Sequence, residues 1–155
     1  MNVEQAIANL QQLERDLPKI VANEMVNFAL DNIRAESWSG VPWAKRKPGS
    51  VRDSGRNLLV DTGAGRRSIK AVQKPSGASL TANEYMQAHN EGARIQGTFS
   101  VRTHTRTRKG RKETVQQHSR TVNFELPERR FTGVSDKQSE RINKLVADKI
   151  VKALT

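Results

Sequence analysis

A pattern that permits few structures other than a β-hairpin lies at residues 101–122, which read VRTHTRTRKGRKETVQQHSRTV. Threonine alternates there with arginine or histidine, and Gly110 lies among basic residues. This alternation predicts two extended runs, 98–107 and 112–124, joined by a tight turn at Gly110. The segment has almost no side chains that could form a core. We therefore expect the tip of this basic hairpin to project from the body of the protein.

The alternation also assigns the side chains of the first strand to two faces. Threonines 103, 105 and 107 fall on one face, and Arg102, His104, Arg106 and Arg108 fall on the other. The base of the hairpin is apolar, so we expect it to join a core; its residues are Phe99, Val101, Val122 and Phe124. The basic residues expected to face a protein partner or DNA are Arg102, Arg106, Arg108, Lys109, Arg111 and Lys112.

The net charge of +11 is concentrated around this hairpin. Residues 94–120 hold eight Lys or Arg against one Glu, a net charge of +7, whereas residues 1–37 have a net charge of −3. A cluster of like charges repels itself unless it is solvated or faces an anion. The sequence leaves two interpretations open, a solvated surface loop and a surface that faces a polyanion.

Helices are predicted at both ends of the chain. Apolar residues recur at three- and four-residue steps through residues 3–36. This pattern predicts either one long helix kinked at Pro18 or two helices in tandem, with Asp16 capping the second. Near the C-terminus, Ser135 and Gln138 form a capping-box pattern that precedes a second apolar helical face. We expect the apolar face of the first helix to pack on a sheet or on a neighbouring subunit.

The composition changes several times between the first helix and the hairpin. Residues 38–57 are rich in proline and glycine and predict an irregular linker, anchored by its tryptophans. A turn follows at Asp61-Thr62-Gly63. The next segments predict a strand at 68–74 and its partner at 77–83, with a turn at 75–77. A short helix is predicted after them. That helix reads NEYMQAHNEG, with Asn83 as its N-cap and Gly92 at its end.

Together these elements predict a single α+β domain over residues 1–155. A long N-terminal helix and a C-terminal helix pack on a small antiparallel sheet, and a long basic β-hairpin projects from it. The expected segments are helical residues 1–37, the linker 38–57, the sheet 58–134 containing the hairpin 98–124, and the C-terminal helix 135–155.

Composition excludes several classes of protein. Without cysteine there can be neither disulfides nor thiolate metal sites, and no run of about 18 apolar residues could span a membrane. The N-terminus lacks the pattern of a signal peptide, so we expect an intracellular, soluble protein without membrane contact. The hydrophobic fraction of 35% is low for a compact monomer, which favours a structure completed by oligomerisation.

No pattern in the chain predicts catalysis, a metal site or a cofactor. GAGRRS at residues 63–68 lacks the Gly-Lys-Ser/Thr ending of a phosphate-binding loop. His89 has no partner at ligand spacing, so a packed or hydrogen-bonded histidine is favoured over a catalytic one. His104 and His118 lie on opposite strands of the hairpin and could face each other, but two imidazoles without a carboxylate make a poor metal site.

Four segments in order resemble tailed-bacteriophage virion morphogenesis and tail-completion (neck) proteins, a group that includes the protein G of Mu-like phages. The segments are VPWAKRK, LLVDTGAGRRSIKAV, EYMQAHNEG and LPERRFTGVSD. The positions that match the family motifs are Trp43; Asp61, Thr62, Gly63, Arg67, Ser68 and Ile69; Tyr85, His89 and Gly92; and Pro127, Arg129, Phe131 and Gly133. The departures are Ala64-Gly65-Arg66 where the family has a leucine, Met86 for a small residue and Arg130 for a proline. The resemblance covers about residues 20–155.

The resemblance implies a structural protein of the phage neck, not an enzyme. It implies a homo-oligomeric, sixfold ring at the head–tail junction of the virion, assembled in the host cytoplasm. The ring would contact the connector or portal side and the tail-tube proteins, with non-specific contact to genomic DNA. Within the domain we expect Trp43, Tyr85 and Phe131 to act as structural anchors.

The alternative is a nucleic-acid-binding module that uses hairpin residues 101–122. Against it, no aromatic residue lies between Phe99 and Phe124 for base stacking, and no recognition helix is recognisable. A nuclease is the least favoured alternative, because no cluster of carboxylates or histidines is evident.

Overall fold

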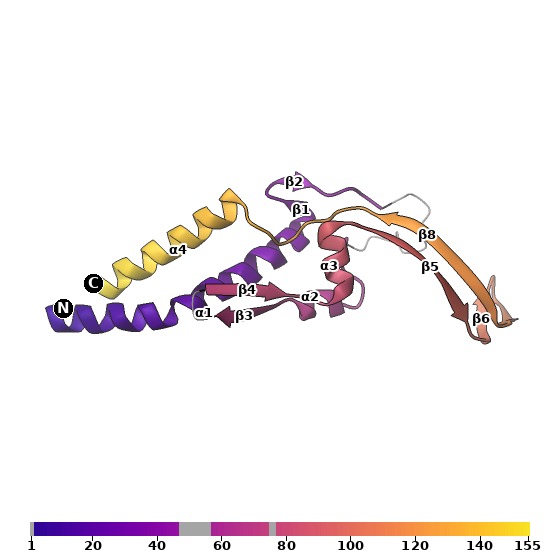
Figure 1. The fold of residues 1–155 in the computed structure, drawn as a ribbon, viewed down its shortest axis with the longest axis horizontal. Coiled ribbons are helices and arrows are strands. Elements are labelled where there is room, and N and C mark those ends of the chain that lie inside the picture. The colour runs from indigo at the N-terminus through magenta and orange to yellow at the C-terminus, as the bar shows by residue number, and fades with distance from the viewer. Residues whose placement is uncertain (1, 47–56, 75–76) are drawn as a thin grey trace.

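The computed structural model describes residues 2–46, 57–74 and 77–155 and shows an elongated α+β chain (Figure 1). Two helices and both chain termini form one end of the molecule, and a long two-stranded ribbon forms the other. The elements are α1 (Val3–Ala35), β1 (Ser37–Trp38), β2 (Val41–Pro42), α2 (Ala64–Ser68), β3 (Lys70–Lys74), β4 (Gly77–Thr81), α3 (Glu84–Glu91), β5 (Ala93–Val101), β6 (His104–Arg108), β7 (Arg111–Val115), β8 (His118–Leu126) and α4 (Asp136–Leu154). The predicted α+β class is confirmed.

Helix α1 is one continuous helix that contains Pro18. Asn2 caps its start by accepting a hydrogen bond of 2.8 Å from the Gln5 amide, and Glu36 ends it in the left-handed conformation. The helix bends near its middle, where proline removes a backbone hydrogen bond (Figure 1). The tandem-helix alternative with Asp16 as a cap is therefore wrong; the Asp16 carboxylate instead accepts a hydrogen bond from Gln12 within the helix.

Helix α4 begins at the predicted cap and packs along α1. The Ser135 hydroxyl accepts a hydrogen bond of 3.2 Å from the Gln138 amide, which confirms that cap. Arg141 joins the two helices through ion pairs of 2.7 Å to Glu24 and 3.0 Å to Asp31. The main contacts of α4 are with α1, and strands β3 and β4 pack against α1 as well. Both α4 and the sheet formed by β3 and β4 thus pack on helix α1.

The strands form four separate two-stranded antiparallel sheets, which pair β1 with β2, β3 with β4, β5 with β8 and β6 with β7. The strand predicted from residue 68 begins only at Lys70, because α2 occupies residues 64–68. The Ser68 hydroxyl ends that helix by donating to the Gly65 carbonyl at 2.7 Å. GAGRRS therefore forms the N-cap Gly63 and one short helix, α2. Helix α3 has the predicted N-cap, since Asn83 accepts a hydrogen bond of 3.0 Å from Met86.

The linker predicted at residues 38–57 is only partly irregular. Strands β1 and β2 form a small hairpin in it, with Trp38 paired to Val41. The Trp38 ring packs edge-on against Phe28 at 5.8 Å between centroids. Residues 47–56 and most of the turn predicted at 75–77 lie outside the described residues.

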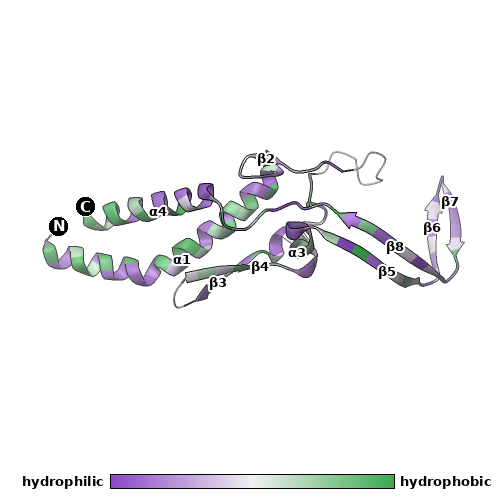
Figure 2. Cartoon of the chain, turned by 45° about the horizontal axis from the view of Figure 1, so that its top comes forward, coloured by the Kyte–Doolittle hydropathy of each residue, from purple (hydrophilic) through white to green (hydrophobic). Residues whose placement is uncertain are grey.

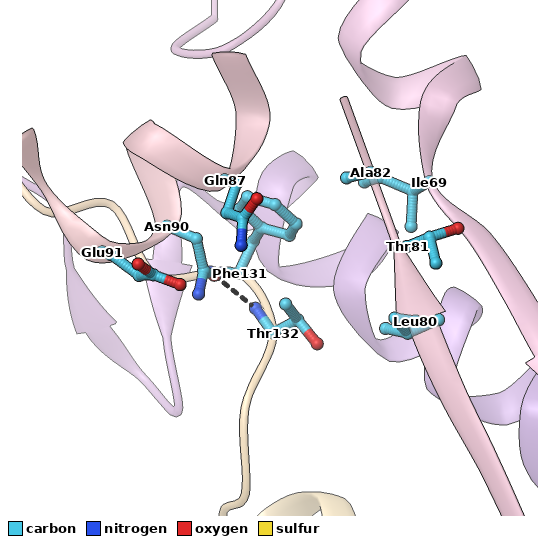
Figure 3. Close-up of a pocket in the computed structure, with 9 residues that line it drawn as sticks. All are labelled: Ile69, Leu80, Thr81, Ala82, Gln87, Asn90, Glu91, Phe131 and Thr132. Carbon is cyan, nitrogen blue, oxygen red and sulfur yellow. Dashed lines mark hydrogen bonds between the residues drawn. The ribbon is translucent and has the colours of Figure 1, made fainter. Parts of the chain in front are cut away.

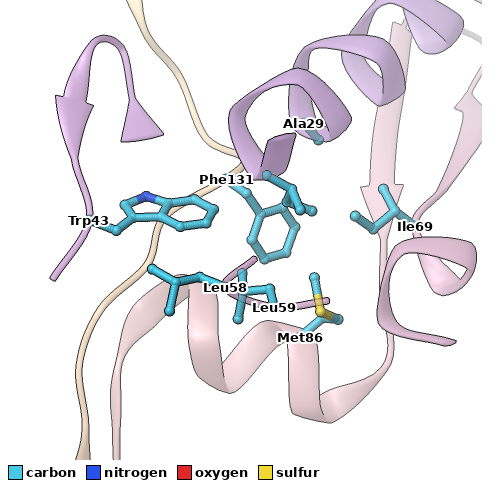
Figure 4. Close-up of a cluster of buried hydrophobic side chains, with 8 residues drawn as sticks. Ala29, Trp43, Leu58, Leu59, Ile69, Met86 and Phe131 are labelled. Atoms are coloured by element: carbon cyan, nitrogen blue, oxygen red, sulfur yellow. The ribbon is translucent and has the colours of Figure 1, made fainter. Parts of the chain in front are cut away.

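A small hydrophobic core lies where α1, α3 and the segment after β8 meet (Figure 4). Phe131 lies among the other core side chains and is 1% exposed. The remaining members of the cluster are Ala29, Ile33, Trp43, Leu58, Leu59, Ile69 and Met86. This core holds the helical end and the ribbon end of the molecule together.

Candidate interaction surfaces

Residues 93–126, hereafter the ribbon, form two successive strand pairs, with β5 and β8 next to the core and β6 and β7 at the tip. Strands β5 and β8 converge at Gly92. This glycine has a φ of +71°, and a Cβ added there would lie 3.1 Å from the Glu128 amide nitrogen. The Arg129 amide donates to the His89 carbonyl at 2.7 Å, and its guanidinium donates to the Ala44 carbonyl. The base of the ribbon is therefore tied to α3 and to the segment after β2.

The side chains of two asparagines fix the segment around Phe131 by hydrogen bonds to its backbone. The Asn90 side-chain oxygen accepts from the amides of Phe131 and Thr132, both at 3.0 Å. The Asn32 side-chain nitrogen, Nδ2, donates to the Phe131 carbonyl at 3.3 Å. Sequence reasoning missed both asparagines. The one available signal was the position of Asn90 beside His89 in the α3 motif.

The three predicted anchors differ in burial. Trp43 and Phe131 are both buried, and the Trp43 indole donates to the Arg130 carbonyl at 2.8 Å. Tyr85 is about half exposed, and its ring packs edge-on against His89 with 4.9 Å between centroids. Tyr85 therefore covers the histidine from the surface and does not fill the core.

His89 is held in its neutral form by its surroundings. Burial, reinforced by the positive charge of Arg129, lowers the pKa of His89 from 6.5 to about 4. Its Nδ1 atom is buried without a hydrogen-bond partner among the described residues. A histidine in this environment is uncharged at neutral pH and packs as part of the domain.

The shifted pKa of His89 predicts a specific pH dependence of stability. Between about pH 6.5 and pH 4 the unfolded chain binds a proton that the folded chain does not, so the free energy of unfolding falls as the pH falls. We expect His89→Gln to reduce this slope between pH 5 and 6.5, measured by urea unfolding. The control variant His104→Gln, in the exposed part of the ribbon, should keep it. Equal slopes in wild type and His89→Gln would contradict the assignment.

A pocket of about 320 Å³ lies between α3 and β4 (Figure 3). Gln87, Asn90 and Glu91 line one side, and Ile69 and strand residues near Leu80 line the other. Phe131 and Thr132 complete it, and the dashed line in Figure 3 marks the hydrogen bond from Thr132 to Asn90. Of the described residues that line it, Glu91 alone is ionisable.

No group of three His, Cys, Asp or Glu residues within 2–46, 57–74 and 77–155 is placed to hold a metal ion. The histidines of the ribbon do not face each other, because His104 pairs with Val115 and His118 pairs with Val101. In the same described ranges, no helix combines the length and the apolar character needed to cross a bilayer.

The tip of the ribbon is the hairpin predicted at Gly110; the pairing of Arg108 with Arg111 leaves a turn of two residues, Lys109 and Gly110. Lys109 and Gly110 have φ values of 49° and 78°, as a tight turn between twisted strands requires. Pairing of β6 with β7 places Arg106, Arg108 and Arg111 on one face and Lys112 on the other. Arg102 lies in the break between β5 and β6 and is not part of this strand pair. The structure therefore brings together three of the six predicted basic residues.

The basic tip is exposed, and the whole ribbon has a net charge of +6 from eight Lys or Arg and two Glu. Arg106 forms an ion pair of 3.2 Å with Glu113 across the strands, but both side chains are about half exposed. Such a surface pair contributes only about 0–1 kcal/mol. Most of the positive charge is available for an external anion.

The base of the predicted hairpin does not join the core, contrary to the prediction. Phe99 and Phe124 are 55% and 49% exposed, respectively. They are exposed because β5 and β8 extend away from the helices and the core (Figure 1). Further exposed apolar side chains lie at the opposite end of the molecule, on the free ends of α1 and α4, and Figure 2 shows hydrophobic bands at both places. Those helix ends lie side by side, since Asn9 donates to the Ala153 carbonyl at 3.0 Å.

The profile of the phage virion morphogenesis family matches residues 1–151 of this chain. No curated protein and no solved structure shows a significant match to it.

Proposed function

We propose that this chain, which belongs to the phage virion morphogenesis family, joins head to tail as a neck or tail-completion protein. Membership of the family makes it a structural, virion-associated protein of a bacteriophage. The observation that carries the finer proposal is the ribbon, which projects from a small core with its basic tip exposed. A projecting two-stranded element is suited to reach a neighbouring protein, and its free edges allow strand addition.

In this proposal several copies form a ring at the head–tail junction, sixfold by resemblance to the family. The ring contacts the connector or portal side above and the tail-tube proteins below. The basic tip pairs with acidic groups on one of these proteins. We favour such docking over a position in the lumen, because tight binding of phosphates would retard a genome that must leave quickly.

The second candidate is a nucleic-acid-binding module, which is supported by the three arginines on one face of the tip. These could neutralise phosphates without reading bases, in a salt-sensitive manner. Strands β6 and β7 contain no aromatic residue on which a base could stack, which disfavours this alternative.

Inactivation of the gene in the phage tests the proposed function. We expect filled heads and complete tails to accumulate separately, because only the joining step is lost, and electron microscopy would reveal both. Addition of the purified chain to such a lysate should restore joined, infectious particles. Normal particles without the chain, or the absence of tails altogether, would contradict a role at the junction.

A further inference from the structure

We propose that the apolar face of β5 and β8 in one copy packs on the first three turns of α1 in a second copy. This contact rests on the self-assembly proposed above and gives it specific surfaces. Both surfaces are unpartnered within the described chain, and they lie at opposite ends of the molecule (Figure 1). A contact between two different surfaces of identical chains is head-to-tail, and it closes into a ring when the rotation between copies permits.

The strand register defines the apolar face of the ribbon. Ile95 pairs with Phe124, Gly97 with Val122, and Phe99 with Arg120. Because alternate residues share a face, these pairs lie on one side of the sheet, and the other side carries Arg94, Gln96, Thr98, Ser100 and their polar partners. The Phe99 ring lies over Gly97, where an added Cβ would be 3.4 Å from it.

Nothing extensive covers this face among residues 2–46, 57–74 and 77–155. The principal contacts of β5 among the described residues are with β8. Phe99 and Phe124 consequently remain about half exposed, although each could bury a large apolar area. An apolar face rimmed by polar residues is typical of a protein–protein contact.

The receiving surface is a stripe along the start of α1. Val3 and Ile7 are 76% and 52% exposed, and Leu10 continues the same stripe at the next helical step. Helix α4 packs beside this stripe and leaves it uncovered. Glu14, four residues beyond Leu10, follows on the same face and is exposed.

Charge selects this pairing over a contact between two ribbons. Two ribbons of net charge +6 would repel each other, and each apolar face carries an exposed Arg120. The α1 stripe instead ends in the carboxylate of Glu14, whereas the apolar face of the ribbon carries Arg120 opposite Phe99. Residues 2–16 have a net charge of −2, from three acidic residues and one arginine. The two surfaces are therefore complementary in both apolar extent and charge.

The dimensions of the two surfaces agree. From Ile7 to Glu14 the helix rises about 10 Å, at about 1.5 Å per residue. From Phe124 to Arg120 the strand rises about 13 Å, at about 3.3 Å per residue. An ion pair between Glu14 and Arg120 therefore places Leu10 near Val122 and Ile7 near Phe124.

Cross-linking tests this alignment directly, because the chain has no native cysteine. An affinity-tagged Ile7→Cys chain and an untagged Phe124→Cys chain are mixed and treated with a short bis-maleimide. We expect the mixed dimer to form at least tenfold faster than with Val72→Cys in place of Ile7→Cys; Val72 is an exposed apolar residue of β3. Equal rates, or a Phe124→Cys homodimer as the main product, would overturn the proposal.

Charge reversal tests the same contact independently. Arg120→Glu or Glu14→Arg alone, in the cysteine-bearing chains, should slow formation of the mixed dimer about tenfold, and the two together on opposite partners should restore it. Arg94→Glu, on the polar face of the same strand pair, is the matched control and should have little effect. Absence of restoration would overturn the assignment of this pair.

The two proposals fail separately. Normal head–tail joining by a phage carrying Glu14→Arg, together with no specific cross-link, would remove the contact and leave the neck function. The opposite result is also possible: the chain cross-links specifically, but heads join to tails without it. That result would remove the neck function and leave the contact.

Discussion

Phe131→Ala is expected to lower the free energy of unfolding by about 3–5 kcal/mol, the usual cost of removing a fully buried aromatic ring. Phe131 is 1% exposed and lies in the cluster that joins α1, α3 and the base of the ribbon. Small domains are stable by only about 5–15 kcal/mol, so this single change removes a large fraction of the total. The cavity cannot collapse readily, because Asn90 and Asn32 hold the backbone on both sides of the ring.

Denaturant unfolding and thermal melting measure the effect of Phe131→Ala. For a chain of this size, a loss of 3–5 kcal/mol corresponds to a decrease in Tm of roughly 6–20 °C. Trp43→Ala should cost a comparable amount, since Trp43 is buried in the same cluster. Phe99→Ala is the matched control: its ring is 55% exposed, and we expect a loss of less than about 1 kcal/mol. Unchanged melting of Phe131→Ala with loss of assembly would assign this ring to an interface.

Replacement of the six basic ribbon residues by serine is expected to reduce phage infectivity to background while the chain still folds. The replaced residues are Arg102, Arg106, Arg108, Lys109, Arg111 and Lys112. All six are exposed and lie outside the core, so the melting temperature should change little. Their removal eliminates the positive charge that pairs with an acidic partner in the proposed docking. Electron microscopy of the lysate should show separate heads and tails.

A variant with the same loss of charge in the body of the protein controls for net charge. Serine replaces six exposed lysines, namely Lys19, Lys45, Lys70, Lys74, Lys137 and Lys144. This variant should join heads to tails normally. If the ribbon variant also joins normally but retains or ejects DNA defectively, the tip faces DNA in the lumen. If the ribbon variant is as infectious as the wild type, the basic tip neither docks on a protein partner nor faces DNA in the lumen.

Local signals in the sequence were sufficient for most of the secondary structure. The caps at Asn83 and Ser135 and the turn at Gly110 depend on residues within a few positions of one another. Alternation of side chains likewise predicted the exposed basic tip without reference to the rest of the chain. Such features depend only on interactions between residues that are close in the sequence, so a single segment is enough to predict them.

Packing between distant segments decided the features that the sequence left open or gave no signal for. Helix α1 continues through Pro18 because α4, β3 and β4 pack along it and offset the lost hydrogen bond. Asn90 and Asn32 acquire their role only when residues 41 and 99 positions away reach them.

The apolar base of the predicted hairpin shows the same limit. Its alternation correctly predicts a strand face, but burial of Phe99 and Phe124 depends on whether another element lies against them. Sequence thus determined the local conformation and the charge of each segment. Tertiary structure decided which apolar faces are covered, because burial is a property of the contacts between segments and not of any one of them.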